Sequence, residues 1–171
     1  LLRDYQQEIV DDYVKTEAEN NRENKLIFLS TGAGKSAIIV ELVRINFLKK
    51  DPKPVLVLIR GRSLVSQISI SLTKSGVPHS TVMGGGELSN IVTVASIDTL
   101  RERNLASYNP HLIIIDEAHR AVSASYKKVL KNLNGRKYLF TATPYKPGLD
   151  YLVKEENILN PIKFLDLVAK K

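Results

Sequence analysis

The 171-residue sequence contains no cysteine and no tryptophan, and it has a single methionine. Without cysteine, the chain cannot form a disulfide, a cysteine-ligated zinc site or a thiol nucleophile. It has no apolar run near the roughly 18 residues needed to cross a bilayer, and its N-terminus lacks the basic and then apolar pattern of a signal peptide. We therefore expect neither a secreted disulfide scaffold nor a membrane partner.

An excess of acidic residues is also missing, because 25 Lys and Arg face 18 Asp and Glu, a formal net charge of +7. The first 20 residues carry −4, which leaves +11 on the remainder. A basic body suits a polyanionic partner such as nucleic acid, although many basic proteins have none. With 43% hydrophobic and 25% charged residues, we expect one globular domain over residues 1–171, taken from a longer protein because it begins at Leu1.

Short apolar runs alternate with amphipathic segments, a pattern that predicts an α/β fold with a mostly parallel open sheet and helices on both faces. The expected strands are 26–29, 55–59, 80–83, 91–95, 112–115 and 138–141. The expected helices are 5–17, 35–48, 63–74 and 123–133, with another near 162–169. Ligands of such sheets bind beyond the carboxyl ends of the strands, so the residues after each apolar run are the candidate functional residues.

A candidate phosphate loop, Ser-Thr-Gly-Ala-Gly-Lys-Ser at 30–36, follows the first apolar run and precedes a helical pattern. Phosphate binding needs glycines that let the backbone approach the anion, helix N-terminal amides, a lysine for the outer phosphates and a hydroxyl for Mg²⁺. These groups are supplied by Gly32, Gly34, Lys35 and Ser36. The general pattern begins with glycine where this chain has Leu29, so the loop is a variant.

A candidate acidic motif, Asp-Glu-Ala-His at 116–119, follows the apolar run 112–115. Hydrolysis of a nucleoside triphosphate needs a carboxylate that holds Mg²⁺ and a group that orients the attacking water. Asp116 suits the first task and Glu117 the second. Alone, such a pair more often marks the start of a helix, but together with the phosphate loop it favours the catalytic interpretation.

The phosphate loop, the acidic motif and Thr-Ala-Thr-Pro at 141–144 resemble, in this order, motifs I, II and III of superfamily-two DEAD/DEAH-type helicases. The similarity covers about 2–161 and is closest to DNA repair and branch-migration helicases, phage recombination helicases and restriction-enzyme motor subunits. It implies a RecA-like P-loop NTPase domain that uses ATP and Mg²⁺ in a DNA helicase. The implied catalytic residues are Lys35, Asp116, Glu117 and His119, and Ser36 and Asp116 would hold the metal, partly through water.

The resemblance also implies an adenine-recognising segment at 2–6, in which Gln6 reads the base edge while Arg3 and Tyr5 lie nearby. Thr31 and Ala33 complete the expected nucleotide contacts. Thr141 and Thr143 would couple the nucleotide state to nucleic-acid movement, and His119 would link them to the Mg²⁺ end. Without the resemblance, 2–6 would simply begin a helix and the threonines would end a strand.

Three further segments, 58–67, 84–86 and 93–100, resemble the nucleic-acid motifs of that family. The implied contact residues are Arg60, Arg62, Gly85, Gly86, Thr93 and Ser96. Simpler interpretations remain open: a solvated basic loop for the arginines, a hairpin connection for the glycines and a helix cap for Ser96. Backbone-directed contacts carry no sequence information, and single-stranded or branched DNA is favoured over RNA.

Motors of this family have a second RecA-like domain that carries the arginine fingers, whereas only 27 residues follow Pro144 here. We therefore expect the second domain to be a partner outside this chain and the isolated chain to be largely inactive, in the cytoplasm of a bacterial or phage-infected cell. Alternatives are a duplex-DNA translocase that does not separate strands and a nucleotide-gated DNA-binding module. A P-loop kinase would need an acceptor pocket and lid that the sequence does not indicate.

Overall fold

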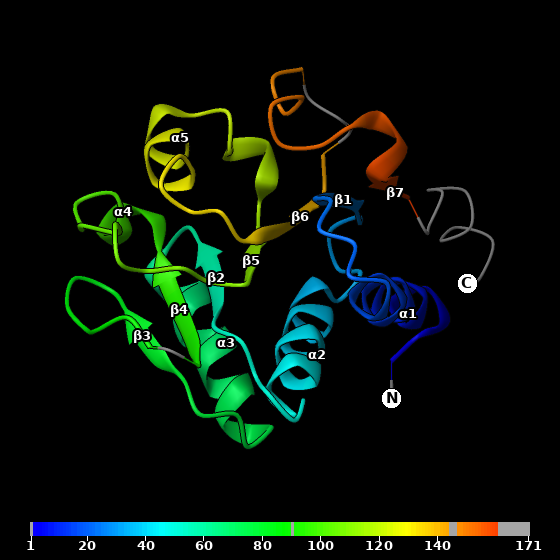
Figure 1. Cartoon of the computed structure of the whole chain (residues 1–171), viewed down its shortest axis with the longest axis horizontal. Helices are drawn as coiled ribbons and strands as arrows, with labels where there is room; N and C mark the ends of the chain where they lie inside the picture. Colours follow the sequence, from blue (N-terminus) through cyan, green and yellow to red (C-terminus); the bar gives the residue numbers. More distant parts are fainter. Residues whose placement is uncertain (1, 90, 144–146, 161–171) are drawn as a thin grey trace.

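The computed structural model describes residues 2–89, 91–143 and 147–160, which form a 7-stranded sheet in the order β3-β4-β2-β5-β6-β1-β7. All neighbouring strands pair in parallel (Figure 1). The strands are β1 (Lys25–Phe28), β2 (Val55–Ile59), β3 (Ser80–Val82), β4 (Val92–Ser96), β5 (Leu112–Ile115), β6 (Arg136–Thr141) and β7 (Ile158–Leu159).

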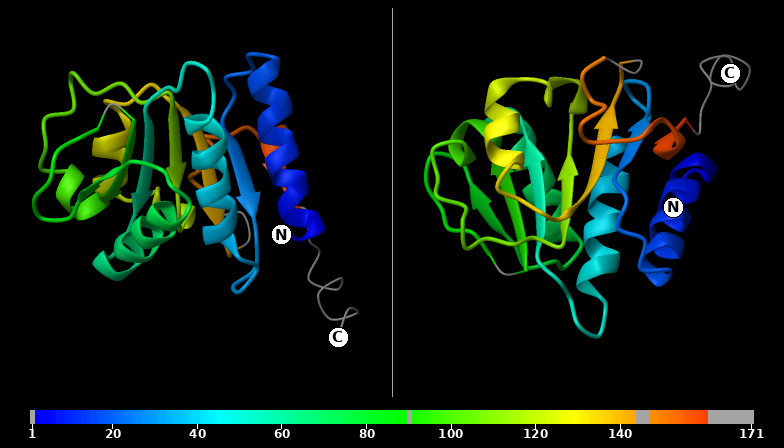
Figure 2. Two further views of the ribbon diagram at one scale, coloured as in Figure 1. Left: turned by 90° about the horizontal axis from the view of Figure 1, so that it is seen from below. Right: turned by 45° about the horizontal axis from the view of Figure 1, so that its top comes forward.

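Helices cover both faces of this sheet (Figure 2). They are α1 (Asp4–Ala18), α2 (Lys35–Phe47), α3 (Arg62–Lys74), α4 (Ile97–Leu100) and α5 (Ala124–Leu130), with 3-10 turns η1 (Ala118–Arg120) and η2 (Glu155–Asn157). None of the helices in the described part of the chain is long and apolar enough to cross a membrane.

Alternation along the buried strands divides the core into two apolar clusters. In β2, Val55, Val57 and Ile59 pack with α1, α2 and α3, whereas Leu56 and Leu58 pack with α4 and α5 on the other face. Successive strand side chains point to opposite faces, so a strand covered on both sides is apolar at every position. This is why the continuous apolar runs indicated strands correctly.

The predicted α/β architecture is confirmed, and β2 and β5 have the expected bounds. β6 begins two residues earlier than predicted, because Arg136 and Lys137 belong to the strand and are buried despite their charge. α5 ends at Leu130 rather than at 133, and β7 was not predicted. The helix expected near 162–169 lies outside the described residues.

Candidate nucleotide and nucleic-acid site

Because the strands are parallel, the predicted site segments lie on the side where the strands end. We call this side of the sheet, at the C-terminal ends of the strands, the carboxyl edge. The phosphate loop follows β1, Asp116 follows β5, and Thr141 ends β6, which lies between those two strands. Arg60 follows β2, the next strand beyond β5. The strand order therefore places the acidic motif and the phosphate loop on either side of the threonine motif.

The phosphate loop has the geometry of an anion site at a helix N-terminus. Gly34 caps α2 with φ 76° and ψ 37°, a left-handed conformation that favours glycine. A Cβ at Gly34 would also displace Nε2 of Gln6 from its contact with the loop. Lys35 and the half-buried Ser36 are the first two residues of α2, where backbone amides lack helical partners.

The start of α1 is tied directly to this loop. Gln6, buried at 5% exposure, donates from Nε2 to the Ala33 carbonyl at 2.9 Å, and Tyr5 donates its hydroxyl to the same carbonyl at 3.0 Å. Oε1 of Gln6 accepts the Arg3 amide at 2.9 Å, and Arg3 Nη1 donates to the Tyr5 hydroxyl at 2.9 Å. The structure thus brings the three predicted adenine-segment residues together beside the loop, and their contact with adenine stays a prediction.

The phosphate-loop lysine reaches the acidic motif. Nζ of Lys35 lies 3.6 Å from Oε1 of Glu117, whose backbone has φ 54°, one of two positive φ values at non-glycine residues in the described part of the chain. A glutamate rarely adopts this left-handed conformation, which costs about 1 kcal/mol or more and is found most often at functional sites. The Glu117 amide donates to Oδ1 of Asp116 at 2.9 Å, and burial raises the pKa of the Asp116 carboxyl.

The acidic motif in turn contacts the threonine motif. Nδ1 of His119 lies 3.4 Å from Oε2 of Glu117 and 3.3 Å from Oγ1 of Thr141. The hydroxyls of Thr141 and Thr143 are 3.0 Å apart. One line of polar contacts therefore runs from Lys35 through Glu117 and His119 to the two threonines. Pro144, the last residue of the threonine motif, lies outside the described residues.

The six predicted nucleic-acid residues differ in exposure: four lie on the surface and two are buried. Arg60 and Arg62 are exposed at the end of β2 and the start of α3, as a backbone contact would require, and Gly85 is exposed with open space around it. A Cβ at Gly86 (φ 90°) would overlap the Thr81 carbonyl, so this glycine is explained by the turn itself.

The structure places Thr93 inside the sheet, and its contact with nucleic acid stays a prediction. Its side chain is fully buried in β4, and its hydroxyl accepts the Ser89 amide at 2.8 Å. Ser96 is also buried, at 4% exposure, where α4 begins. Sequence analysis missed Thr99, whose hydroxyl accepts the Gly84 amide at 2.8 Å and joins the glycine turn to α4; a lone threonine gives no signal for this role.

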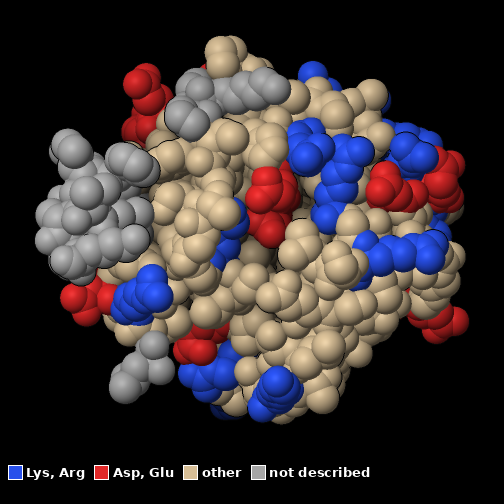
Figure 3. All heavy atoms as spheres, turned by 180° about the vertical axis from the view of Figure 1, so that it is seen from behind, with Lys and Arg blue, Asp and Glu red and all other residues tan. Residues whose placement is uncertain are grey.

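Basic side chains do not form one continuous patch on the face seen in Figure 3. They lie there in separate groups among uncharged surface, with acidic side chains between them. Basic side chains on this face are thus dispersed rather than concentrated in one place.

Comparison with known proteins gives a consistent result. Residues 1–146 match the family described as "Type III restriction enzyme, res subunit". The "Putative mitochondrial ATP-dependent helicase irc3" of Schizosaccharomyces pombe is 28% identical over 193 residues, which cover 99% of this chain and 32% of that protein. The chain thus spans about a third of the length of this relative.

Two solved structures resemble the fold. The UvsW helicase of bacteriophage T4 has a TM-score of 0.74 at 20% identity, over 94% of this chain and 60% of that one. The Sulfolobus solfataricus SWI2/SNF2 ATPase core in complex with dsDNA has a TM-score of 0.72 at 18% identity, over 88% of this chain and 34% of that one. The family match, over most of the length of this chain, carries the assignment: the chain belongs to the type III restriction enzyme res subunit family of ATP-dependent helicase and motor domains, and it has their RecA-like α/β fold.

Proposed function

We propose that this chain is the ATP-binding domain of a DNA-dependent motor that couples ATP hydrolysis to movement along DNA or to its unwinding. The observation that carries the proposal is the line of contacts from Lys35 through Glu117 and His119 to Thr141. These contacts connect the phosphate loop, the acidic motif and the threonine motif. A change in the bound nucleotide would therefore alter the contacts of Thr141, in the motif expected to couple the nucleotide state to DNA movement.

The residues at this edge fit a triphosphate. Its phosphates would lie on the free amides at the start of α2, with Lys35 on the outer phosphates. Lys35 is paired with Glu117 in the structure, so a phosphate that competes for this ammonium would free Glu117 to orient the attacking water. Gln6, already beside the loop, would contact the adenine.

Asp116 and Ser36 fit a magnesium ion that is shared with the phosphates. Mg²⁺ usually takes one or two protein ligands and completes its coordination with phosphates and water, so a pair of ligands such as Asp116 and Ser36 suits it. Burial makes the charged form of Asp116 costly, and a cation would offset that cost. When bound, the ion would neutralise charge that develops on the phosphates.

Full activity should require more than this chain. We propose a second RecA-like domain of the same protein as its partner, since a charge-stabilising arginine is worth roughly 10³–10⁵ in rate in related chemistry. We also propose DNA as the partner of the motor, supported by the helicase names of the relatives and by the dsDNA complex of a protein with the same fold.

A second candidate is a translocase that moves along duplex DNA without separating its strands. The restriction-enzyme family match and the resemblance to a SWI2/SNF2 core bound to dsDNA favour it. Strand displacement from a forked duplex would support the helicase, whereas displacement of a third strand from a triplex without unwinding would support the translocase.

The experiment that tests the motor function is steady-state phosphate release by the full-length protein, with and without single-stranded and branched DNA. Lys35→Ala should abolish the DNA-stimulated rate. Lys154→Ala, a matched change at an exposed lysine that pairs with two surface glutamates, should leave it unchanged. ATP binding without DNA-dependent turnover would contradict the motor and favour the nucleotide-gated DNA-binding module.

A further inference from the structure

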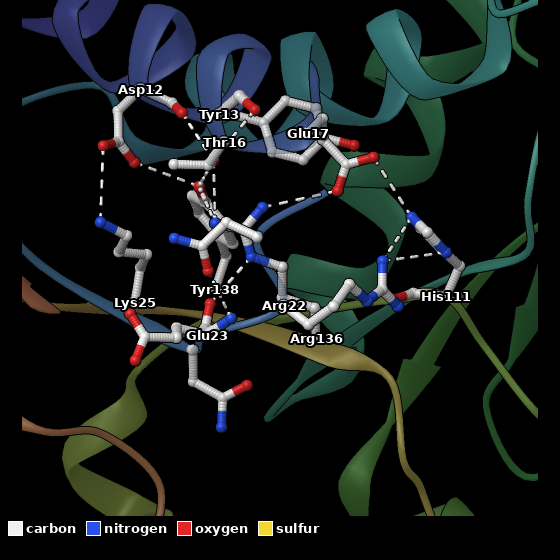
Figure 4. Close-up of polar contacts among 12 residues, drawn as sticks. Asp12, Tyr13, Thr16, Glu17, Arg22, Glu23, Lys25, His111, Arg136 and Tyr138 are labelled. Carbon is white, nitrogen blue, oxygen red and sulfur yellow. Dashed lines mark hydrogen bonds and ion pairs between the residues drawn. The ribbon is translucent and has the colours of Figure 1, made fainter. Parts of the chain in front are cut away.

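A second polar cluster lies where β1 and β6 begin, under the C-terminal half of α1 (Figure 4). We call this side of the sheet, at the N-terminal ends of the strands, the amino edge. We call it the Arg136 cluster; it comprises Asp12, Thr16, Glu17, Lys25, Arg136 and Tyr138. Arg136 is 2% exposed, and three α1 residues in the cluster point toward β1 and β6. A polar network this deeply buried is costly unless its partners are well placed, so its geometry is tightly constrained.

Arg136 fixes the last turns of α1 in several directions at once. Its Nη2 donates to the Thr16 hydroxyl at 2.8 Å and to the Tyr138 hydroxyl at 3.1 Å, and its Nη1 lies 3.5 Å from Oε1 of Glu17. Its Nε donates to the Glu23 carbonyl at 2.8 Å. Because the guanidinium is planar and its donors have fixed directions, these contacts set both the position and the rotation of the helix.

Other members of the cluster act on the same helix. The Tyr138 hydroxyl donates to Oδ2 of Asp12 at 3.2 Å, and Nζ of Lys25 lies 3.5 Å from Oδ1 of Asp12. Asp12 and Thr16 are one turn apart, so β1 and β6 hold two successive turns of α1.

The opposite end of α1 is the end that meets the nucleotide loop through Tyr5 and Gln6. Between the two ends, Ile9, Val10 and Tyr13 pack on the apolar core, and such packing is not directional. Directional contacts therefore hold α1 at both ends, through Tyr5 and Gln6 at the loop and through the Arg136 cluster at the amino edge, and the cluster fixes the setting of the C-terminal half of the helix. From Glu17 to Gln6 the rise is about 16 Å, at 1.5 Å per residue, so the helix can transmit this setting across the sheet.

We propose that the Arg136 cluster is a positioning device for base selection: by fixing α1 at the amino edge, it sets where Gln6 stands at the nucleotide loop and thereby the preference for ATP over GTP. The inference rests on the proposed function, specifically on adenine recognition by Gln6. Arg136 acts here through α1 and touches no nucleotide.

The test measures dissociation constants of ATP and GTP, each with Mg²⁺, for the full-length protein. Tyr138→Phe removes the hydroxyl that joins Arg136 to Asp12 and retains the ring. Tyr108→Phe is the matched control, because this buried tyrosine packs in the cluster on the other face of the sheet. Gln6→Ala and the Gln6→Ala/Tyr138→Phe double variant complete a thermodynamic cycle.

We expect Tyr138→Phe to lower the preference for ATP by roughly threefold to tenfold, the effect of about one hydrogen bond. Gln6→Ala should lower it at least as much, the double variant no further than Gln6→Ala, and Tyr108→Phe not at all. Arg136→Lys should lie between the wild type and Tyr138→Phe.

Two results would overturn the inference and leave the motor standing. In the first, Tyr138→Phe lowers the melting temperature but keeps the ATP:GTP ratio, so that the cluster is only structural. In the second, Gln6→Ala leaves the ratio unchanged while Lys35→Ala still abolishes DNA-stimulated turnover. A wild-type protein that binds neither nucleotide would overturn the inference and the proposed function together.

Discussion

Asp116 and Glu17 are partly buried carboxylates at opposite edges of one sheet, and their pKa values move in opposite directions. At Asp116 burial dominates, and the pKa is raised. At Glu17 burial also raises the pKa, but hydrogen bonds from Lys49 and His111 outweigh it, and the net effect is a lowered pKa. At the carboxyl edge, burial thus disfavours the charged form of Asp116, whereas at the amino edge the charge of Glu17 is compensated within the protein.

The comparison predicts that changes at the carboxyl edge affect turnover more than folding. Glu117→Gln should lower DNA-stimulated phosphate release by about 10²–10⁴-fold, because an amide cannot accept a proton from the attacking water. ATP binding, measured by titration, should persist. Glu156→Gln, at an exposed surface glutamate, is the control. Unchanged turnover in Glu117→Gln would show that Glu117 does not orient the attacking water, and it would contradict the expected difference between the two edges.

At the amino edge the same kind of change should affect folding more. Arg136→Met should lower the free energy of unfolding by about 3 kcal/mol, since it leaves Glu17 and two hydroxyls short of a buried partner. Arg60→Met, the matched change at the exposed carboxyl edge, should stay within about 0.5 kcal/mol of the wild type. Denaturant unfolding of both variants measures the difference, and equal losses would contradict it.

Within the carboxyl edge, two adjacent glycines should separate folding from binding. Gly86→Ala should cost about 2 kcal/mol, because the new methyl would overlap the Thr81 carbonyl at a positive φ. Gly85→Ala meets open space and should leave the melting temperature nearly unchanged. A loss of DNA affinity in Gly85→Ala would then report a contact rather than a folding defect.

Acidification should destabilise the chain in part through the amino edge. Burial lowers the pKa of His111 from its usual 6.5, although Glu17 opposes this effect. Below pH 6.5 the unfolded chain therefore gains a proton that folded His111 resists, and below 4.5 the same holds for Glu17. Unfolding free energies between pH 7 and 4 should fall steadily. Glu17→Gln should flatten the lower part of this decline.

Asp116→Asn should have the opposite effect on the same curve. A raised pKa in the folded state means that acid stabilises the folded chain through this carboxyl. Its removal should therefore make the decline with falling pH steeper. A flatter decline in Asp116→Asn would show that the two carboxyl groups do not differ in the way described.

The sequence predicted the carboxyl edge far better than the amino edge, for physical reasons. Phosphate and metal chemistry restricts residue types within short loops, so 30–36 and 116–119 were recognisable locally. Arg136 carries no such pattern, because its partners on α1 are more than a hundred residues away in sequence. Hydrophobic patterning also assigns charged residues to the surface, and Arg136 and Lys137 therefore shortened the predicted β6.

Thr93 shows a second limit of motif analysis. The motif resemblance supplied a residue type at a position, but not the end or the face of the strand on which it lies. Thr93 pairs with Leu56 near the start of β4, whereas Ser96 pairs with Ile59 at its end. The register of the sheet thus distinguishes Thr93, which is enclosed within the strand, from Ser96 at its end.

The outermost strands of the described sheet, β3 and β7, have only three and two residues. Each offers few free backbone groups to a strand of another molecule, and a sheet with short borders is a poor template for aggregation. Such borders leave the described sheet little backbone with which to extend itself onto a second copy of the chain.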